Sequence, residues 1–231
     1  MSNKKIRISL LQIEGRETPI LNASLIKKSL IKAYKFNPDI VCLPECANIM
    51  TANKSHLFKH ATLQKDCPVL KECIQFAKKY NKYVSVGSLL LKRNNSSKLF
   101  NRSFFINHLG KILAYYDKIH LFDVDINRKE VHRESKSFHK GNKVTFVTSP
   151  WGKIGLTICY DIRFPNLYRN LVKQGVKIIL VPAAFTVPTG KDHWEILLRS
   201  RAIENTSFII ATGQCGKHHA RRATYGHSMI V

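Results

Sequence analysis

The sequence predicts an α/β fold in which helices cover sheets whose other faces pack against each other. Three observations lead to this fold class. Strand-like and helix-like segments alternate along the 231 residues, and several strands are continuous runs of Ile, Val and Leu, which is typical of strands buried on both faces. Two turn signals also indicate hairpins among the βαβ units. Because no linker divides the chain, we expect residues 1–231 to form one domain.

In the first half of the chain, apolar runs, helical periodicity and a turn signal define seven elements. Leu25, Leu30 and Ala33 share one helical face, which predicts a helix around them. The turn at Leu109-Gly110 separates two strand-like runs and indicates a hairpin. We expect strands at 6–13, 39–43 and 83–91, helices at 22–34 and 69–80, and hairpin strands at 104–107 and 112–116.

The second half begins with residues 124–143, which are polar and rich in charge, so we expect a loop there. A second hairpin is expected around Pro150-Trp151-Gly152, and Gly175 provides a helix stop. The expected elements are strands at 144–148, 153–159, 178–181, 208–212 and 227–231, with helices at 166–174 and 194–205.

The chain is strongly basic, with a formal net charge of +23. Its lysines are scattered, and no single element combines basic residues with base-stacking aromatic residues, as nucleic-acid-binding modules do. The composition therefore favours lysine at exposed positions over a nucleic-acid role, and it is compatible with steering of an anionic small substrate.

Neither a membrane segment nor a metal site is indicated. No apolar run approaches the ~20 residues that span a bilayer, and the basic N-terminus lacks a signal-peptide cleavage site, so we expect a cytoplasmic protein. The six cysteines are then expected to be reduced thiols. Cys42 and Cys46 have no second ligand pair at zinc-site spacing, and no glycine-rich loop is present to hold a nucleotide phosphate. We expect no metal and no cofactor.

Three polar residues stand just past the ends of apolar strands. Glu45 follows the strand at 39–43, Lys118 follows the strand at 112–116, and Cys159 ends the strand that begins at 153. Because ligands bind beyond the carboxyl ends of strands in α/β sheets, an acid, an ammonium and a thiol at three such ends would form a reactive site.

Each of these residues also has an ordinary structural interpretation, since a lone cysteine is usually a small apolar residue and a lone lysine or glutamate is usually at the surface. Their surroundings favour function. Cys159 precedes Tyr160-Asp161 and a helix beyond Pro165, and such a corner exposes the sulfur and provides N–H groups for an oxyanion. Lys118 lies among Tyr and Ile, which is unusual for a surface lysine.

The segments around these residues closely resemble the nitrilase superfamily. Residues 155–165 (Gly-Leu-Thr-Ile-Cys-Tyr-Asp-Ile-Arg-Phe-Pro) resemble its nucleophile motif, residues 43–45 (Leu-Pro-Glu) its glutamate motif, and residues 116–122 (Tyr-Asp-Lys-Ile-His-Leu-Phe) its lysine motif, in the same order. The resemblance implies a four-layer αββα sandwich, subunits that pair into a homodimer, and an amidase with a Glu-Lys-Cys triad.

The resemblance also implies a mechanism. Glu45 would act as general base on Cys159, the thiolate would attack the amide carbon, and a thioester would form. Lys118 and the backbone N–H of Tyr160 would stabilise the oxyanion. Glu134 matches a second glutamate of the superfamily that helps to position the lysine or the substrate, and the alternative is an ordinary loop carboxylate.

Within the superfamily, the second half resembles the branch of amidases that hydrolyse deaminated glutathione. The segments that carry this resemblance are 182–190, 193–195, 199–204, 214–219 and 225–228. Omega-amidases, which act on 2-oxoglutaramate, share the lysine and cysteine motifs but generally lack the Gln-Cys-Gly and His-His segments. The favoured substrate is therefore a small anionic amide such as deaminated glutathione, and 2-oxoglutaramate is the alternative.

Motif position further implies Arg163, Thr186 and His193 as substrate contacts. His218, His219, Arg221 and Arg222 form a dense polar cluster, which we expect to be a loop at the pocket mouth that attracts substrate carboxylates.

Relatives usually continue past the segment that ends at Val231 with a further strand and an extension. The resemblance therefore implies a domain without its C-terminal strand, a weakened dimer, and a third alternative from another class: an inactive fold that binds partners through its basic surface.

Overall fold

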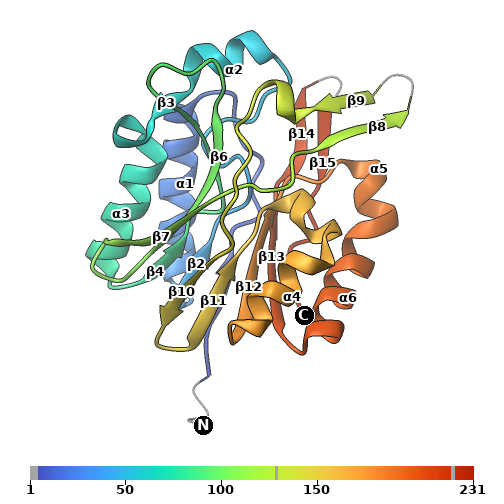
Figure 1. Ribbon diagram of the computed structural model, residues 1–231. Helices are drawn as coiled ribbons and strands as arrows, with labels where there is room; N and C mark the ends of the chain where they lie inside the picture. The colour runs from blue at the N-terminus through green and yellow to red at the C-terminus, as the bar shows by residue number, and fades with distance from the viewer. Residues whose placement is uncertain (1–4, 128–129, 220–221) are drawn as a thin grey trace.

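The computed structural model describes residues 5–127, 130–219 and 222–231. Two sheets pack face to face, and helices cover the outer face of each one (Figure 1). The predicted α/β fold with helices outside and sheets inside is therefore confirmed. The layers run from α1 and α3 through a seven-stranded sheet and a five-stranded sheet to α4 and α6 (Figure 1).

The seven-stranded sheet is formed by the first half of the chain. Its order is β1-β2-β4-β6-β5-β3, with β7 paired to β6. The strands are β1 (Ile8–Leu10), β2 (Ile40–Cys42), β3 (Thr62–Leu63), β4 (Tyr83–Ser85), β5 (Leu89–Lys92), β6 (Phe100–Ile106) and β7 (Ile112–Asp117). β1, β2 and β4 run parallel, whereas β6 and β7 form the predicted antiparallel hairpin.

The five-stranded sheet is formed by the second half, in the order β10-β11-β12-β13-β16. The predicted hairpin is confirmed as β10 and β11, which pair antiparallel, while β11, β12 and β13 run parallel. The bounds are β10 (Thr145–Ser149), β11 (Gly152–Leu156), β12 (Val176–Ala183), β13 (Phe208–Gly213) and β16 (Met229–Ile230).

The long helices begin at recognisable signals. Thr18 caps α1 by accepting a hydrogen bond from the Leu21 N–H, and a proline occupies the first turn of α1, α3 and α4. The helices are α1 (Pro19–Tyr34), α2 (Lys54–His60), α3 (Pro68–Tyr80), α4 (Pro165–Lys173), α5 (Val187–Thr189) and α6 (Glu195–Asn205). The four predicted helices correspond to α1, α3, α4 and α6.

Alternation along β2 explains why its sequence is apolar throughout. Ile40 and Cys42 pack in the core between the two sheets, and Val41 packs in the core beneath α1 and α3. Successive side chains of a strand point to opposite faces, and here both faces are buried. The carboxyl end of β2 is therefore fixed from two sides, and Glu45 follows it.

Three predictions about local structure were wrong. The strand expected at 83–91 is divided into β4 and β5, which pair with successive parts of β6, because Gly87 between them has a φ of +71°. Residues 124–143 are not simply a loop, and the cluster that begins at His218 is not a loop, since both regions form hairpins. These are β8 (Asp123–Asn127) with β9 (Glu130–Arg133), and β14 (Cys215–His219) with β15 (Arg222–Tyr225).

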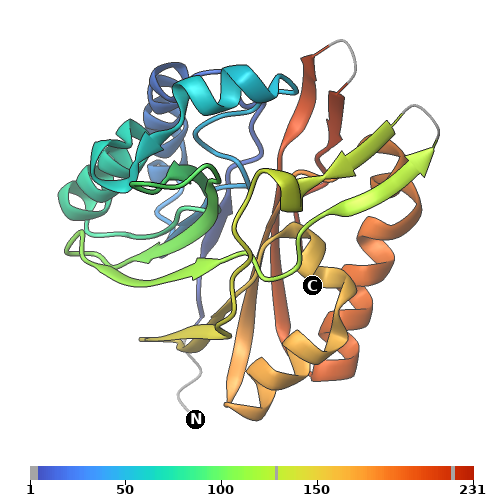
Figure 2. The ribbon, with the colours of Figure 1, turned by 45° about the horizontal axis from the view of Figure 1, so that its top comes forward.

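Both hairpins lie outside the two main sheets, on the same side of the molecule as α2 (Figure 2). Residues 123–127 alternate between polar and apolar side chains, which is a strand signal. The high charge of the surrounding segment led to the expectation of a loop instead. Arg221 of the polar cluster lies outside the described residues.

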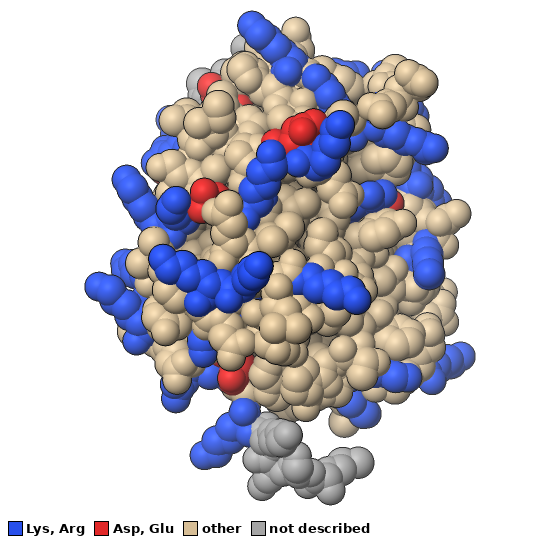
Figure 3. All heavy atoms as spheres, turned by 90° about the vertical axis from the view of Figure 1, so that its left-hand side faces the viewer, with Lys and Arg blue, Asp and Glu red and all other residues tan. Residues whose placement is uncertain are grey.

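The surface carries basic residues over a wide area. On the face that α1 and α3 cover, Lys and Arg side chains are spread among other residues, with few Asp or Glu side chains between them (Figure 3). In the part of the chain that the structure describes, none of the helices combines the length and the apolar character that crossing a bilayer requires.

Candidate active site

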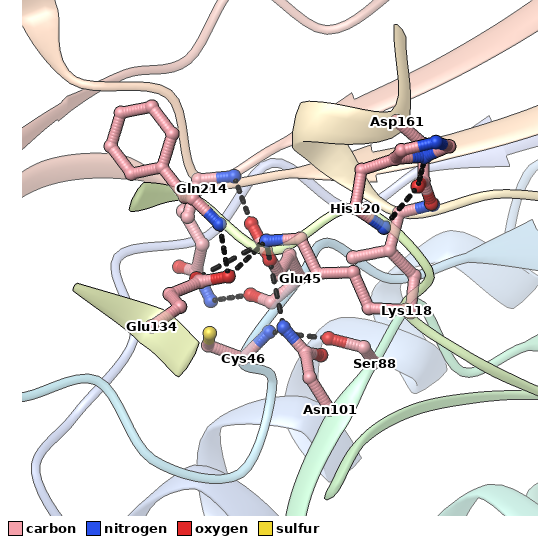
Figure 4. Close-up of polar contacts among 12 residues, drawn as sticks. Glu45, Cys46, Ser88, Asn101, Lys118, His120, Glu134, Asp161 and Gln214 are labelled. Atoms are coloured by element: carbon pink, nitrogen blue, oxygen red, sulfur yellow. Dashed lines mark hydrogen bonds and ion pairs between the residues drawn. The ribbon is translucent and has the colours of Figure 1, made fainter. Parts of the chain in front are cut away.

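Glu45 is a buried carboxylate held by several donors (Figure 4). Its Oε1 accepts hydrogen bonds from Lys118 Nζ and Asn101 Nδ2, each at 2.9 Å. Its Oε2 accepts the backbone N–H of Ala184, also at 2.9 Å. The backbone carbonyl of Glu45 accepts a hydrogen bond from Gln214 Nε2 at 2.9 Å. Both the carboxylate and its backbone are therefore fixed by residues distant in the sequence.

Lys118 lies just past the end of β7, and its side chain is only 1% exposed. Its ammonium group donates to Glu45 at 2.9 Å and to both oxygens of Glu134, at 3.0 and 3.1 Å. Glu134, in the short 3₁₀ helix Glu134–Lys136, is itself held by the backbone N–H of Phe122 at 2.9 Å. Two carboxylates thus enclose one buried cation, as a buried charge requires.

Cys159 begins the 3₁₀ helix Cys159–Arg163, just beyond β11, with a positive φ of +50°. This left-handed conformation is uncommon for a residue with a Cβ atom and is often found at functional sites. The Cys159 thiol lies beside the Glu45 carboxylate, and their hydrogen-bonding interaction lowers the pKa of Glu45 and raises that of Cys159. The structure therefore brings the three predicted residues together, with Glu45 in contact with both of the others.

The electrostatics of the site set the protonation of these groups. Burial alone would raise the pKa of Glu45, but the Lys118 charge and the hydrogen bonds from Cys159, Lys118 and Asn101 lower it overall. Burial opposes the charge on Lys118, yet Glu134 and Glu45 hold its pKa well above the usual value. Burial and the Glu45 charge raise the pKa of Cys159 well above normal. The resting site thus contains a carboxylate, an ammonium and a neutral thiol.

A pocket of about 120 Å³ opens over these groups. Its apolar wall includes Met50, Leu57, Leu90, Phe122 and Phe138, and its polar wall includes Thr186, His132 and Arg222. Glu134 and Tyr160, which the sequence predicted as supporting residues, and Thr186, predicted as a substrate contact, all line the same pocket.

Arg163 and His193 occupy a different position. Neither belongs to the pocket lining; instead Arg163 Nη2 and His193 Nδ1 contact each other at 3.1 Å. The Arg163 guanidinium lies 5.9 Å from the ring centre of Tyr160 and 5.6 Å from that of Phe185. Both rings line the pocket, so Arg163 lies behind the pocket wall, where it supports these rings.

A second thiol, Cys46, also lines the pocket but differs from Cys159. It packs in an apolar cluster with Ile49 and Met50, and burial raises its pKa, with the Glu45 charge adding to this effect. Glu45 affects Cys46 only through its charge, whereas it has a hydrogen-bonding interaction with Cys159, so of these two thiols Cys159 is the one placed against the carboxylate.

His218 has a structural role in the β14–β15 hairpin. Its Nε2 contacts Thr224 Oγ1 at 2.7 Å, and its Nδ1 contacts the Gly15 carbonyl at 3.2 Å. Burial lowers the pKa of His218, which favours the neutral ring. Within residues 5–127, 130–219 and 222–231, no three His, Cys, Asp or Glu side chains gather in a way that could hold a metal ion.

Sequence reasoning missed the groups that orient Glu45. Asn101 lies on β6 and Gln214 just after β13, and both side chains are almost fully buried. The sequence signal that could have identified them is a polar residue within or next to an apolar strand, because a buried polar side chain requires a hydrogen-bond partner. Asp161, also missed, accepts hydrogen bonds from the Tyr116 hydroxyl at 2.8 Å and from His120 Nδ1 at 2.7 Å.

Known proteins resemble this chain over its whole length. The carbon-nitrogen hydrolase family model matches residues 7–231. A deaminated glutathione amidase of Yersinia enterocolitica is 40% identical over 99% of this chain and 80% of its own length, and one of Dictyostelium discoideum is 38% identical over 100% and 81%.

Solved structures agree with this similarity. The nitrilase and fragile histidine triad fusion protein of Caenorhabditis elegans superposes with a TM-score of 0.92 at 35% identity, over 100% of this chain and 56% of that longer one. A nitrilase-superfamily protein of Saccharomyces cerevisiae gives 0.86 at 27% identity, over 98% and 82%. With fold and sequence in agreement, the chain belongs to the carbon-nitrogen hydrolase family of the nitrilase superfamily.

Proposed function

We propose that this protein is an amidase that hydrolyses the C–N bond of a small anionic amide through a thioester on Cys159. The observation that carries the proposal is the position of the Glu45 carboxylate, which contacts both the Lys118 ammonium and the Cys159 thiol within one pocket. A nucleophile, its base and a fixed positive charge are the parts that acyl transfer requires.

In the acylation half-reaction, Glu45 accepts the thiol proton as the Cys159 sulfur attacks the amide carbon. A neutral resting thiol fits this order, because the proton moves only when a substrate is present to be attacked. The carbonyl oxygen becomes an oxyanion. When the C–N bond breaks, Glu45 returns the proton to the departing amine, and the acyl group remains as a thioester on Cys159.

In the deacylation half-reaction, Glu45 accepts a proton from a water molecule that attacks the thioester carbon. The C–S bond then breaks, the sulfur regains the proton from Glu45, and the carboxylic acid leaves. Glu45 acts in both half-reactions. The hydrogen bonds from Asn101 and the Ala184 N–H, which orient its carboxylate, therefore contribute to both steps of each turnover.

The oxyanion is stabilised by Lys118 and by the backbone N–H of Tyr160. The Tyr160 amide lies in the first turn of a 3₁₀ helix, where N–H groups lack partners within the helix. Lys118 provides a positive charge that needs no reorientation, because Glu45 and Glu134 already fix it. Glu134 is a positioning residue that keeps Lys118 charged.

Deaminated glutathione is the favoured substrate because relatives that carry this name match 99% and 100% of the chain. The Gln-Cys-Gly segment adds support, because it resembles this branch and omega-amidases generally lack it. 2-Oxoglutaramate is the alternative enzyme substrate. An inactive basic binding protein is the alternative from another class, and its binding would depend steeply on salt and not on Cys159.

The test is the release of amine or ammonia from deaminated glutathione and from 2-oxoglutaramate, with wild type, Cys159→Ala and Cys215→Ala compared. Cys215 is a matched control because it is a free thiol outside the pocket lining. We expect release by wild type and Cys215→Ala, and at least a ~1,000-fold loss in Cys159→Ala.

Mass spectrometry of a rapidly quenched reaction gives a second readout, because a trapped acyl group must map to Cys159. Turnover that persists in folded Cys159→Ala would contradict the thioester mechanism. Absence of release from both amides by folded wild type would contradict the proposed substrates.

A further inference from the structure

The catalytic pocket continues outward into a second hollow, here called the outer vestibule. The vestibule has a volume of about 390 Å³ and is lined by residues of α2 and β9, including Lys54 and Arg133. The two hollows share Thr51, Leu57, His132, Glu134, Phe138 and Arg222, and Glu134 is already paired with Lys118. A substrate longer than the inner pocket therefore passes Arg222.

Arg222 is held in place by the surrounding chain. It is half-buried at the start of β15, and Nη1 donates to the Thr51 carbonyl at 3.3 Å. The same strand is attached to the pocket wall, because Thr224 forms a β-bridge with Thr186 and the Tyr225 N–H donates to the Phe185 carbonyl at 3.0 Å. The Arg222 guanidinium is therefore carried by a strand, β15, that is fixed to the pocket wall, and it lies where the pocket and the vestibule meet.

The two cations of the catalytic pocket differ in their partners. Lys118 is already compensated by Glu45 and Glu134. Among the described residues, Arg222 forms a single hydrogen bond, to a neutral carbonyl, and no ion pair. A guanidinium has five N–H donors in a planar fork, so four remain available to a ligand.

The net charge of the pocket also indicates that Arg222 is available to an anionic ligand. Glu45 and Glu134 both face the inner pocket, and without Arg222 they would outnumber the Lys118 charge. An anionic substrate would then meet a site with net negative charge. With Arg222 the four charges balance, and the unpaired one lies at the outer end.

We propose that Arg222 forms a carboxylate-binding subsite that selects amides carrying an anionic group away from the scissile bond. The proposal rests on the proposed amidase function and adds the residue that defines its substrate class. A carboxylate matches the planar guanidinium fork and can accept two parallel hydrogen bonds from it. The carboxylate can belong to the acyl part or to the departing amine, and the experiment distinguishes these two sources.

The experiment compares matched amides that differ in one carboxylate. Glutaramate and valeramide form the acyl-side pair, and N-valerylglycine and N-ethylvaleramide form the amine-side pair, so that in each pair a methyl group replaces the carboxylate. The readout is the ratio of kcat/KM for the charged member to that for the neutral member. It is measured for wild type, Arg222→Met, Arg222→Lys and Arg169→Met, where Arg169 is an exposed residue of α4 that gives the same change of charge outside the pocket.

We expect Arg222→Met to lower this ratio by about 30-fold in one pair, as for a charge-assisted hydrogen bond in a partly buried site. Arg222→Lys should recover part of the ratio, because it keeps the charge and loses the fork. Arg169→Met should keep the wild-type ratio. The pair that responds identifies the side of the substrate that carries the carboxylate.

Two results would overturn the subsite. One is a ratio that Arg222→Met leaves unchanged in both pairs. The other is an equal loss for charged and neutral members, which would make Arg222 a support of the wall. Circular dichroism confirms that each variant is folded.

A binding measurement separates this proposal from the amidase itself. Glutarate is titrated calorimetrically into Cys159→Ala, with and without Arg222→Met, so that no turnover is needed. We expect the second substitution to weaken glutarate binding at least tenfold. Binding that depends on Arg222 without any amide turnover by wild type would retain the subsite and remove the amidase. Amide turnover by wild type, together with glutarate binding that does not depend on Arg222 and a kcat/KM ratio that Arg222→Met leaves unchanged, would retain the amidase and remove the subsite.

Discussion

The Asp161 carboxylate accepts a hydrogen bond from the Tyr116 hydroxyl at 2.8 Å, and this contact joins β7 to the 3₁₀ helix that contains Cys159. Tyr116 belongs to β7, two residues before Lys118, and Asp161 lies two residues after Cys159. The same carboxylate accepts the Ile158 N–H at 2.8 Å and the His120 N–H at 3.0 Å. The segments that carry the lysine and the thiol therefore share one anchor.

The first prediction concerns this anchor. Asp161→Asn replaces one acceptor oxygen with a donor, so a buried N–H or O–H must lose its partner. We expect the free energy of unfolding to fall by about 1–3 kcal/mol. Since the Cys159 turn depends on Asp161, we also expect kcat to fall by at least ~10-fold with a smaller change in KM. Urea denaturation and steady-state kinetics measure the two effects.

Asp66→Asn is the control, since Asp66 is exposed on the short helix Gln64–Asp66. An Asp161→Asn protein with the stability and the kcat of Asp66→Asn would show that the anchor has no such role.

A second prediction follows from the raised pKa of Cys159. In the free enzyme, burial and the Glu45 charge keep the thiol neutral, so its alkylation by iodoacetamide should be slow at neutral pH. The midpoint of its pH dependence should lie above the ordinary thiol value of 9.0. In Glu45→Gln the midpoint should fall, because a charge that opposes the thiolate is removed. Peptide mass spectrometry separates Cys159 from the other five cysteines.

A third prediction concerns stability against pH. Folding lowers the pKa of Glu45 below the ordinary value of 4.5, so its carboxylate stabilises the fold above that value. The contribution disappears as the pH falls through the lower folded-state pKa. Glu45→Gln lacks this titration, so its free energy of unfolding should decline less steeply between about pH 5 and pH 3. Denaturant titrations across this range provide the measurement, and equal slopes would contradict the prediction.

The two glutamates that contact Lys118 should differ in their effect on catalysis. Glu45→Gln removes the base of both half-reactions, so we expect kcat to fall by about 10²–10⁴-fold. Glu134→Gln keeps the base and removes only one of the two carboxylates that enclose the lysine, so its loss should be smaller. Single-turnover kinetics on the same amide compare the two variants. Equal losses would place Glu134 in the chemistry rather than beside it.

The sequence indicated the three candidate residues that the structure brings together, but not the groups that hold them in place. Glu45, Lys118 and Cys159 each follow an apolar strand, and strand periodicity is a local signal. The Ala184 N–H that holds Glu45 comes from 139 residues further along the chain, and no local pattern encodes that contact. Arg222 was expected at the pocket mouth as part of a basic cluster, and it does line the pocket, but the expected loop is a strand because β15 pairs with β14.

The last prediction tests how closely the backbone around Glu45 is packed. Gly87 has a φ of +71°, and a Cβ built on it would lie 2.1 Å from the Pro44 carbonyl oxygen and 2.3 Å from that of Leu43. Gly87→Ala must therefore displace the segment that carries Glu45. We expect a loss of roughly 3 kcal/mol or more in stability and an amidase activity reduced together with it.

Gly152→Ala is the matched control for this substitution. Gly152 also has a positive φ, of +105°, but no atom lies within 4 Å of the Cβ position. Its replacement has only the conformational cost of a left-handed residue, about 1–2 kcal/mol, and Gly152 is the first residue of β11, directly after the β10–β11 turn. If thermal denaturation showed that Gly87→Ala and Gly152→Ala lose the same stability, the destabilisation at Gly87 would come from its positive φ alone. A larger loss of stability at Gly87, with activity falling only there, would place the cause in the contact with the Leu43–Pro44 backbone that leads to Glu45.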